Sequence, residues 1–369
     1  MSFDHSELAP EHIRAIAPYQ PGKPISELER ELGISGIVKL ASNENPLGAS
    51  PQAVEAARAA LGEIGLYPDG NGFALKDAIA QRYAVTHPHI VLGNGSNDLL
   101  ELSARAFLSA GDRAVYSAHA FAVYALATQA VGARGIAVPA QQFGHDLEAM
   151  RVTAVAQQAK MVFVANPNNP TGTFLSGEAL HQFLTALPGN ILVVLDEAYN
   201  EYLPEDCRYD SVSWLADFPN LIVSRTFSKA YGLASLRVGY ALTHPHVADM
   251  LNRVRQPFNV NSPAQAAAVA SLQDSEFVRR TFELNRRGMQ QIENGLQALG
   301  LEYIPSYGNF ISFRIPNAMR IYQRLLELGV IVRPIANYDM PDWLRVSIGL
   351  EIENEKFLSA LKQAQGEQA

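Results

Sequence analysis

Short, mostly apolar runs alternate with longer amphipathic stretches through the middle of the chain. Residues 161–165, 191–195 and 221–225 are rich in Val, Ile and Leu, which predicts strands buried on both faces. The stretches between them, 176–187 and 211–215, are expected to be helical or partly helical. This alternation predicts an α/β fold, with a mostly parallel sheet flanked by helices.

After about residue 255 the pattern changes. A long polar-rich stretch, residues 263–299, is expected to be helical. It is followed by separated strands and a further helix, expected at 310–315, 330–333 and 344–348 for the strands and at about 321–328 for the helix. This mixture predicts an α+β layout.

The chain is therefore expected to have three parts. Residues 1–34 are rich in Pro and Glu and are predicted to form an arm that joins the small domain or a partner subunit. Residues 35–255 would form a large domain, and residues 256–369 a smaller C-terminal domain.

Composition narrows the classes of protein that fit. With 369 residues, 48% of them hydrophobic, the chain can bury a large core. A net charge of -8 argues against binding to nucleic acid or anionic membranes. The single cysteine, Cys207, excludes an internal disulfide and fits a reducing compartment. The first residues do not have the pattern of a secretory signal, so a soluble, cytoplasmic protein is expected.

Polar motifs follow each of the three central strands. Asn169 lies in an Asn-Pro-Asn-Asn-Pro-Thr-Gly run after the first, Asp196 and Tyr199 follow the second, and Lys229 follows the third. Taken singly, these are a turn, a helix cap and a surface lysine. Ligands bind at the carboxyl ends of strands in open α/β sheets, so their shared position predicts one site.

A fourth motif, Gly93-Asn94-Gly95, precedes an expected helix that begins near Ser96 and Asn97. Backbone amides at a helix N-terminus can bind an anion such as phosphate. Gly-x-Gly is common, so this motif alone is weak. No His-x-x-x-His pair with a carboxylate is present, and no metal site is expected.

Residues 226–240, with Ser228 beside Lys229 and Arg237 eight residues later, resemble the lysine motif of fold-type I aminotransferases of classes I and II. These enzymes use pyridoxal 5′-phosphate (PLP). Further segments resemble the histidinol-phosphate aminotransferase family, namely residues 19–24, 39–46, 67–70, 257–261 and 344–349. The resemblance implies a large domain with a mixed, mostly parallel sheet and a smaller α+β domain. Ser235, where many relatives have Gly, and the segment 119–121 depart from the family pattern.

The resemblance also implies a role for each motif residue. Lys229 would bond to the PLP aldehyde, and Asp196 would pair with the pyridine nitrogen. Asn169 and Tyr199 would hydrogen-bond the phenolic oxygen, and Phe121 would stack on the ring unless it is ordinary core. The remaining cofactor residues, which would surround the phosphate, are Ser96, Asn97, Thr226, Ser228, Arg237 and Tyr67.

Tyr67 resembles the tyrosine that reaches the phosphate of the neighbouring subunit, which would make the protein a homodimer with shared active sites. Its alternative is a residue packed against the Pro68-Asp69-Gly70 turn. For substrate, Arg345 resembles the arginine that binds the α-carboxylate. Tyr19, Asn43 and Arg333 are the other substrate candidates, and Arg333 could instead form a structural ion pair.

The expected reaction is PLP-dependent transamination between L-histidinol phosphate and 2-oxoglutarate, giving imidazole acetol phosphate and L-glutamate in histidine biosynthesis. Two other enzymes would use the same lysine: an aromatic amino-acid aminotransferase and a threonine-phosphate decarboxylase. A PLP-binding regulator without turnover is a further alternative, although the chain has no DNA-binding segment.

Overall fold

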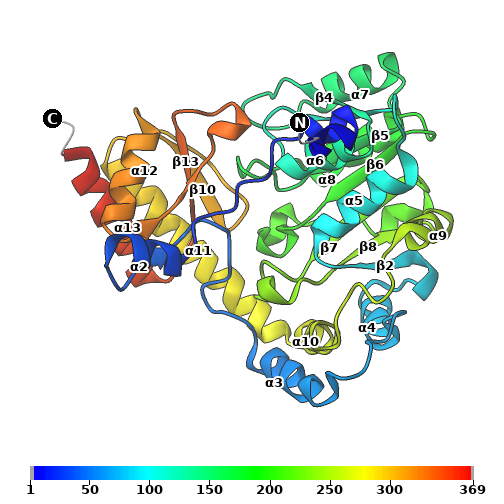
Figure 1. Ribbon diagram of the computed structural model, residues 1–369, viewed down its shortest axis with the longest axis horizontal. Helices are drawn as coiled ribbons and strands as arrows, with labels where there is room; N and C mark the ends of the chain where they lie inside the picture. Colours follow the sequence, from blue (N-terminus) through cyan, green and yellow to red (C-terminus); the bar gives the residue numbers. More distant parts are fainter. Residues whose placement is uncertain (1–3, 367–369) are drawn as a thin grey trace.

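The computed structural model describes residues 4–366 and has at its centre a seven-stranded sheet (Figure 1). The strand order is β2-β8-β7-β6-β5-β3-β4, and only β8 runs antiparallel to its neighbours. In chain order the strands are β2 (Ile90–Gly93), β3 (Arg113–Ser117), β4 (Arg134–Val138), β5 (Met161–Ala165), β6 (Leu192–Asp196), β7 (Leu221–Thr226) and β8 (Gly239–Thr243). The expected α/β fold is confirmed.

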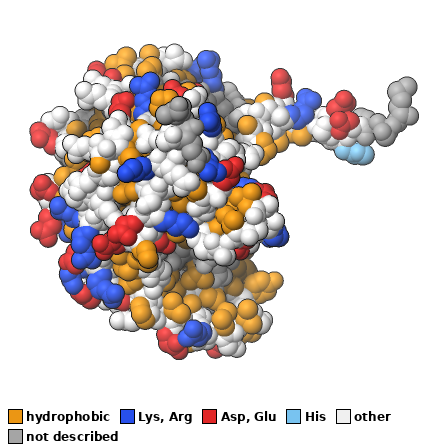
Figure 2. Space-filling view, turned by 90° about the vertical axis from the view of Figure 1, so that its left-hand side faces the viewer, with side chains coloured by type: hydrophobic (Ala, Val, Ile, Leu, Met, Phe, Trp, Pro, Cys, Tyr) orange, Lys and Arg blue, Asp and Glu red, His pale blue; other side chains and the backbone are white. Residues whose placement is uncertain are grey.

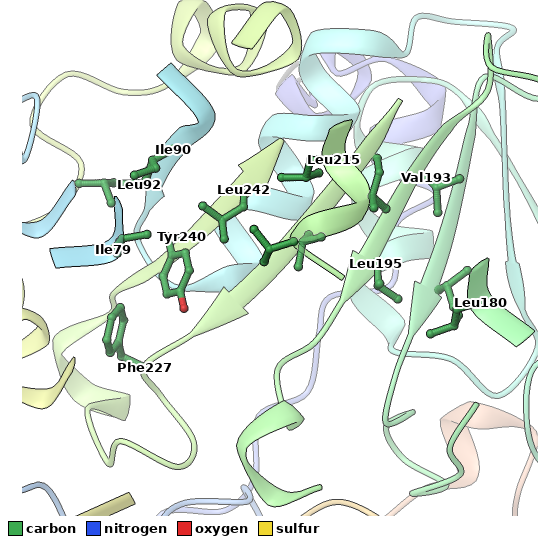
Figure 3. Packing of buried hydrophobic residues seen from close by; sticks show 14 of the residues in the cluster. Ile79, Ile90, Leu92, Leu180, Val193, Leu195, Leu215, Phe227, Tyr240 and Leu242 are labelled. Carbon is green, nitrogen blue, oxygen red and sulfur yellow. The ribbon is translucent and has the colours of Figure 1, made fainter. Parts of the chain in front are cut away.

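Helices cover both faces of this sheet, because alternate side chains of each strand point to opposite sides. One face packs on α3 (Pro51–Ala60), α4 (Phe73–Tyr83), α7 (Leu147–Ala156), α8 (Gly177–Ala186) and α10 (Ser262–Gln273). The other face packs on α5 (Ser96–Phe107), α6 (Ala122–Ala130) and α9 (Pro245–Val254). In β6, Val193 and Leu195 belong to the first core and Val194 to the second. Figure 3 shows the first two beside Leu180 of α8.

A second, antiparallel sheet lies to the left in Figure 1, with strand order β12-β13-β10-β9. Its strands are β9 (Tyr303–Ile304), β10 (Phe310–Arg314), β12 (Arg333–Pro334) and β13 (Trp343–Ser347). Its core includes side chains of α11 (Ser275–Ala298), α12 (Ala318–Glu327) and α13 (Glu351–Gly366). A parallel pair, β1 (Val38–Lys39) with β11 (Val330–Ile331), joins the N-terminal segment to this part.

Two sequence-based predictions were wrong in detail. The helix expected over 263–299 is broken at Asp274, whose carboxylate accepts hydrogen bonds from Phe277 N at the start of α11 and from Ser50 Oγ. The break lets α10 pack on α3 while α11 packs on the second sheet. The strand expected over 330–333 is divided into β11 and β12, which pair in different sheets.

The N-terminal segment contains two short helices, α1 (Glu11–Arg14) and α2 (Ile25–Leu32). Figure 2 shows the first described residues of this segment projecting from the body of the molecule. Further along, α2 buries Leu28 against Leu326 of α12 and Ile331 of β11. The expected division into three parts stays a prediction, and α10, which follows its second boundary, packs on helices that precede it. Within residues 4–366 no helix is long and apolar enough to cross a membrane.

Candidate active site

A cavity lies where the carboxyl ends of β2, β5, β6 and β7 meet the second sheet. Fourteen of the predicted site residues line it: Tyr19, Asn43, Ser96, Asn97, Phe121, Asn169, Asp196, Tyr199, Thr226, Ser228, Lys229, Arg237, Arg333 and Arg345. They come from the N-terminal segment, from the ends of central strands and from β12 and β13. Parallel strands end at the same edge of a sheet, which is why motifs 30 or so residues apart converge here.

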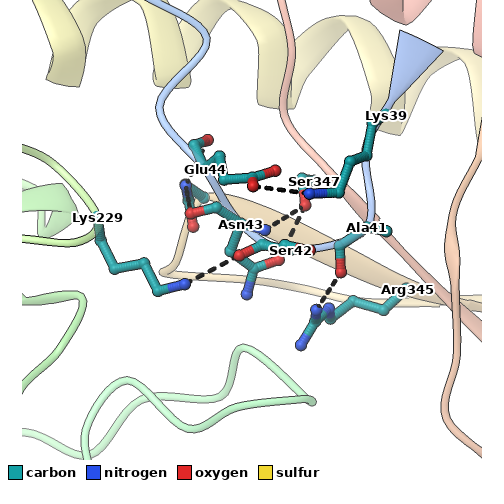
Figure 4. A network of polar contacts seen from close by, with 9 residues as sticks. Lys39, Ala41, Ser42, Asn43, Glu44, Lys229, Arg345 and Ser347 are labelled. Carbon is teal, nitrogen blue, oxygen red and sulfur yellow. Dashed lines mark hydrogen bonds and ion pairs between the residues drawn. The ribbon is translucent and has the colours of Figure 1, made fainter. Parts of the chain in front are cut away.

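Lys229 follows β7 and reaches across the cavity to the N-terminal segment. Its Nζ donates a 2.9 Å hydrogen bond to Ser42 O (Figure 4). Burial, together with the positive charge of Arg345, lowers the pKa of Lys229 to about 7. A large fraction of this amine is therefore neutral near pH 7 and able to act as a nucleophile or a base.

Asp196 ends β6 and is 6% exposed. Its Oδ2 accepts a 2.9 Å hydrogen bond from the Tyr124 hydroxyl, while its buried Oδ1 has no partner among the described residues. Burial raises the pKa of Asp196 to about 6, against the opposing effect of the Tyr124 hydrogen bond. A buried acceptor without a partner costs free energy, so this oxygen suits a protonated nitrogen in the cavity.

A group of hydrogen-bond donors, called here the anion cradle, lines the cavity around the start of α5. Gly95 precedes this helix with a φ of +82°, and within residues 4–366 no side chain caps the first amides of the helix. The Arg237 guanidinium packs against Gly95 and donates a 3.0 Å hydrogen bond to Ser228 Oγ. Thr226 Oγ1 accepts from Ser228 N. The amides at the start of α5, the two hydroxyls and the guanidinium line the same cavity, and together they are able to hold a phosphate.

Two arginines of the second sheet enter the cavity from β12 and β13. Arg333 and Arg345 are paired residues of these antiparallel strands, so their side chains leave the same face of the sheet. Arg345 donates to Ala41 O at 2.7 Å and to Asn169 Oδ1. Arg333 donates to Gln20 O at 2.6 Å and lies over the ring of Tyr19, with its Cζ 5.5 Å from the ring centroid. Both guanidinium groups are held on fixed partners.

Tyr199 and Asn43 are bonded to each other: Asn43 Nδ2 donates a 2.9 Å hydrogen bond to Tyr199 Oη. Burial raises the pKa of Tyr199 to about 12, so the hydroxyl keeps its proton at neutral pH. Phe121 is the N-cap residue directly before α6, and its ring contacts Tyr124 edge to face, with ring centroids 6.0 Å apart.

Three lining residues with polar side chains were missed by sequence reasoning: Ser42, Tyr124 and Tyr338. Ser42 acts through its backbone oxygen, which no side-chain pattern reveals. Tyr124 lies in an apolar helix and resembles core by its spacing. Tyr338 follows β12, and its carbonyl accepts a 2.7 Å hydrogen bond from His119 Nδ1. The only sequence feature that could have indicated Tyr338 is that it lies five residues after Arg333, which was itself a substrate candidate.

Tyr67 is the predicted site residue that lies outside the cavity. It is 83% exposed and stacks on Phe258, with ring centroids 4.8 Å apart. Within this chain it therefore contacts neither the anion cradle nor Lys229. Across residues 4–366, no group of three or more His, Cys, Asp or Glu side chains is arranged to hold a metal ion.

The sequence model of the aminotransferase class I and II family matches residues 35–361. The chain is 62% identical over 359 residues to histidinol-phosphate aminotransferase of Methylobacillus flagellatus, covering 97% of each sequence. It is 62% identical to histidinol-phosphate aminotransferase 2 of Nitrosospira multiformis, covering 96% of this chain and 91% of that protein.

Among solved structures, the chain is similar to histidinol-phosphate aminotransferase from Sinorhizobium meliloti in complex with pyridoxal-5′-phosphate. The two are 30% identical, the TM-score is 0.91, and the match covers 100% of this chain and 99% of the other. The match therefore spans both sheets of this chain.

Proposed function

We propose that this chain, which belongs to the class I and II aminotransferase family, exchanges an amino group between L-histidinol phosphate and 2-oxoglutarate. The products would be imidazole acetol phosphate and L-glutamate. Membership of the family makes the chain a PLP-dependent transaminase, and the identity to relatives named for this reaction supports the choice of substrates. A cytoplasmic location is part of the proposal, since the single cysteine suits a reducing compartment.

The observation that carries the substrate class is the facing pair Arg333 and Arg345. Like charges directly opposite on a sheet repel each other, and no carboxylate side chain forms a salt bridge with either one in the described chain. An anion between them would offset this repulsion. Histidinol phosphate presents a phosphate ester, and 2-oxoglutarate presents carboxylates, so one pair of guanidinium groups can receive both substrates.

The residues present fit PLP. The uncapped start of α5, with Thr226, Ser228 and Arg237, would hold its phosphate. Asp196 Oδ1, buried and without a partner, would accept from the protonated pyridine nitrogen. Asn169 has its amide oxygen bonded to Arg345, which leaves its NH2 group to donate to the phenolic oxygen.

When bound, PLP supplies an aldehyde that bonds to amines and a ring that withdraws electrons from the carbon beside them. Lys229 is the proposed point of attachment and the proton carrier, because its pKa of about 7 leaves a substantial fraction of its Nζ neutral near pH 7. Its Nζ would take the proton from the α-carbon of the amino donor. Ser42 O accepts a hydrogen bond from this amine, and Asp196, ionised above about pH 6, would place its negative charge against the ring nitrogen.

A homodimer with shared sites is also part of the proposal. Exposed apolar side chains gather near Tyr67: Ile64, Leu66, Phe73 and Phe258. Figure 2 shows hydrophobic side chains at the lower end of the molecule, where Figure 1 places α3 and α10. Large exposed apolar groups of this kind are typical of subunit interfaces. Tyr67 would then reach the anion cradle of the second copy.

A panel of amino donors tests the substrate assignment. Purified enzyme with PLP is assayed with histidinol phosphate, phenylalanine, tyrosine and aspartate, each with 2-oxoglutarate. We expect the highest kcat/KM for histidinol phosphate. A higher value for phenylalanine would point instead to an aromatic amino-acid aminotransferase. Lys229→Ala is expected to lose the visible absorbance that PLP develops on the wild-type protein.

A further inference from the structure

Asn43 is buried, with 1% of its surface exposed, and each of its polar groups has a hydrogen-bond partner. Its backbone N donates to Ser347 Oγ at 2.8 Å, and its Oδ1 accepts from the same Oγ at 2.9 Å. Its Nδ2 donates to Tyr199 Oη, and its backbone O accepts from Asn309 Nδ2 at 3.0 Å. Asn43 therefore links β13, through Ser347, to a residue at the centre of the cavity. Figure 4 shows the bonds between Asn43 and Ser347.

The direction of each of these bonds follows from the one before it. A backbone N–H can only donate, so the bond from Asn43 N makes Ser347 Oγ an acceptor. The single hydroxyl proton of Ser347 is then free to go to the Asn43 side chain, which must present its oxygen. The amide NH2 group is thereby turned toward Tyr199, and Tyr199 Oη is the acceptor.

The proton of the Tyr199 hydroxyl must consequently point elsewhere. In the described chain Tyr199 Oη accepts from Asn43 and donates to no other group. Tyr199 lines the cavity, and Lys229 Nζ lies 5.9 Å from its ring centroid. The free donor therefore faces the space next to the reactive amine.

We propose that Asn43 and Ser347 are positioning residues that orient the Tyr199 hydroxyl so that it donates to the phenolic oxygen of PLP. This inference rests on the proposed function and on the contact between Tyr199 and the phenolic oxygen that the family resemblance implies. It gives Asn43 an orienting role in place of direct substrate contact. The backbone N–H of Asn43 fixes the donor and acceptor directions of the hydrogen bonds among Asn43, Ser347 and Tyr199, because this group can only donate.

The effect would be measurable on the nitrogen that joins Lys229 to PLP. A hydrogen bond donated to the neighbouring phenolic oxygen draws electron density from it and weakens its hold on a proton at that nitrogen. The Tyr199 donor thus lowers the pKa of this nitrogen. If the hydroxyl were turned away, the pKa would rise.

Asn43→Asp reverses the direction with little change of shape. Asn43 has a φ of +56°, a conformation that Asn and Asp both adopt more readily than other non-glycine residues. An ionised Asp has only acceptors, so Tyr199 would donate to it instead of to the cofactor. Ser347→Ala removes the group that orients the amide, and Ser347→Thr, which keeps the hydroxyl, is its matched control.

The experiment is a pH titration of the visible absorbance of the enzyme with PLP, without substrate, together with the dissociation constant for PLP. Tyr199→Phe sets the full effect of losing the donor, expected as a rise of about one pH unit or more. Asn43→Asp should raise the midpoint similarly, and Ser347→Ala by less. Ser347→Thr should match the wild type. In the Tyr199→Phe background, Asn43→Asp should add almost nothing.

Other results would overturn the proposal. An equal shift from Asn43→Asp in the Tyr199→Phe background would mean that the new charge acts directly. Wild-type midpoints for both Asn43→Asp and Ser347→Ala, beside a shifted Tyr199→Phe, would refute the orienting role alone. An unshifted Tyr199→Phe would refute the cofactor role of Tyr199 itself, and the inference with it.

Discussion

The guanidinium of Arg237 occupies the space in which a side chain on Gly95 would lie. Gly95 also has a left-handed φ of +82°, which any L side chain adopts at a cost. The positive φ and the missing side chain of Gly95 both allow the uncapped amides of α5 to lie against the Arg237 guanidinium. The anion cradle depends on the absence of a Cβ at this position.

Gly95→Ala is therefore expected to weaken PLP binding by about 10- to 100-fold, because a displaced Arg237 loses a charge-assisted hydrogen bond. Titration of the visible absorbance measures this. Gly111→Ala is the matched control, since Gly111 has a φ of +89° and open space around it. It should lose about 1 kcal/mol of stability from strain and keep its affinity for PLP. Equal losses of affinity in both variants would contradict the packing argument.

Asp196→Asn should stabilise the cofactor-free protein in a pH-dependent way. Burial raises the pKa of Asp196 from 3.8 to about 6, so the folded state holds its proton more tightly than the unfolded chain. The ionised group therefore costs the folded state up to about 3 kcal/mol above pH 6, and nothing below pH 4. The gain from Asn should be large at pH 8 and vanish at pH 4.

Thermal unfolding without PLP measures this gain. Asp217→Asn, which changes an exposed carboxylate, should show no such pH dependence. With PLP present the order should reverse at pH 8, because Asn lacks the charge that pairs with the ring nitrogen. A stability gain that is the same at pH 4 and pH 8 would argue against a buried charge as its source.

Arg333→Gln should lower kcat/KM for histidinol phosphate by about 10- to 100-fold, the loss expected for one charged hydrogen bond to an anion. The value for phenylalanine as donor should change less, because its side chain has no anion. Arg320→Gln, on the exposed side of α12, controls for the change in net charge. Equal losses for both donors would make Arg333 a structural residue that holds the N-terminal segment through Gln20.

Tyr67→Ala and Lys229→Ala should each reduce activity strongly as homodimers. If sites are shared, mixed dimers contain one complete site, with Lys229 from one subunit and Tyr67 from the other. Mixing the two variants should then restore activity, because each mixed dimer has one working site out of two. Exchange of subunits is verified with differently tagged chains, and exchange without recovered activity would place Tyr67 outside its partner's site.

The amino-acid sequence by itself predicted the strands whose polar successors line the cavity. The apolar strands ending near Ala165, Leu195 and Arg225 are local patterns, and their polar successors Asn169, Asp196 and Lys229 follow them directly. Parallel strands that end together bring such residues together without further information. Local pattern was misleading at Asp274, since a helix that stops and restarts has nearly the same spacing as an unbroken one.

The tertiary structure alone decided which groups meet across long separations. Asn43 and Ser347 are 304 residues apart, and the hydrogen bond from Lys229 to Ser42 O spans 187. Arg333 and Arg345 face each other through the register of β12 and β13, and a shift of one residue would separate them. Periodicity encodes which face of an element is apolar, whereas register and packing determine the partner of each polar atom. The residues that line the cavity could thus be predicted from the sequence, and the hydrogen bonds that orient them could not.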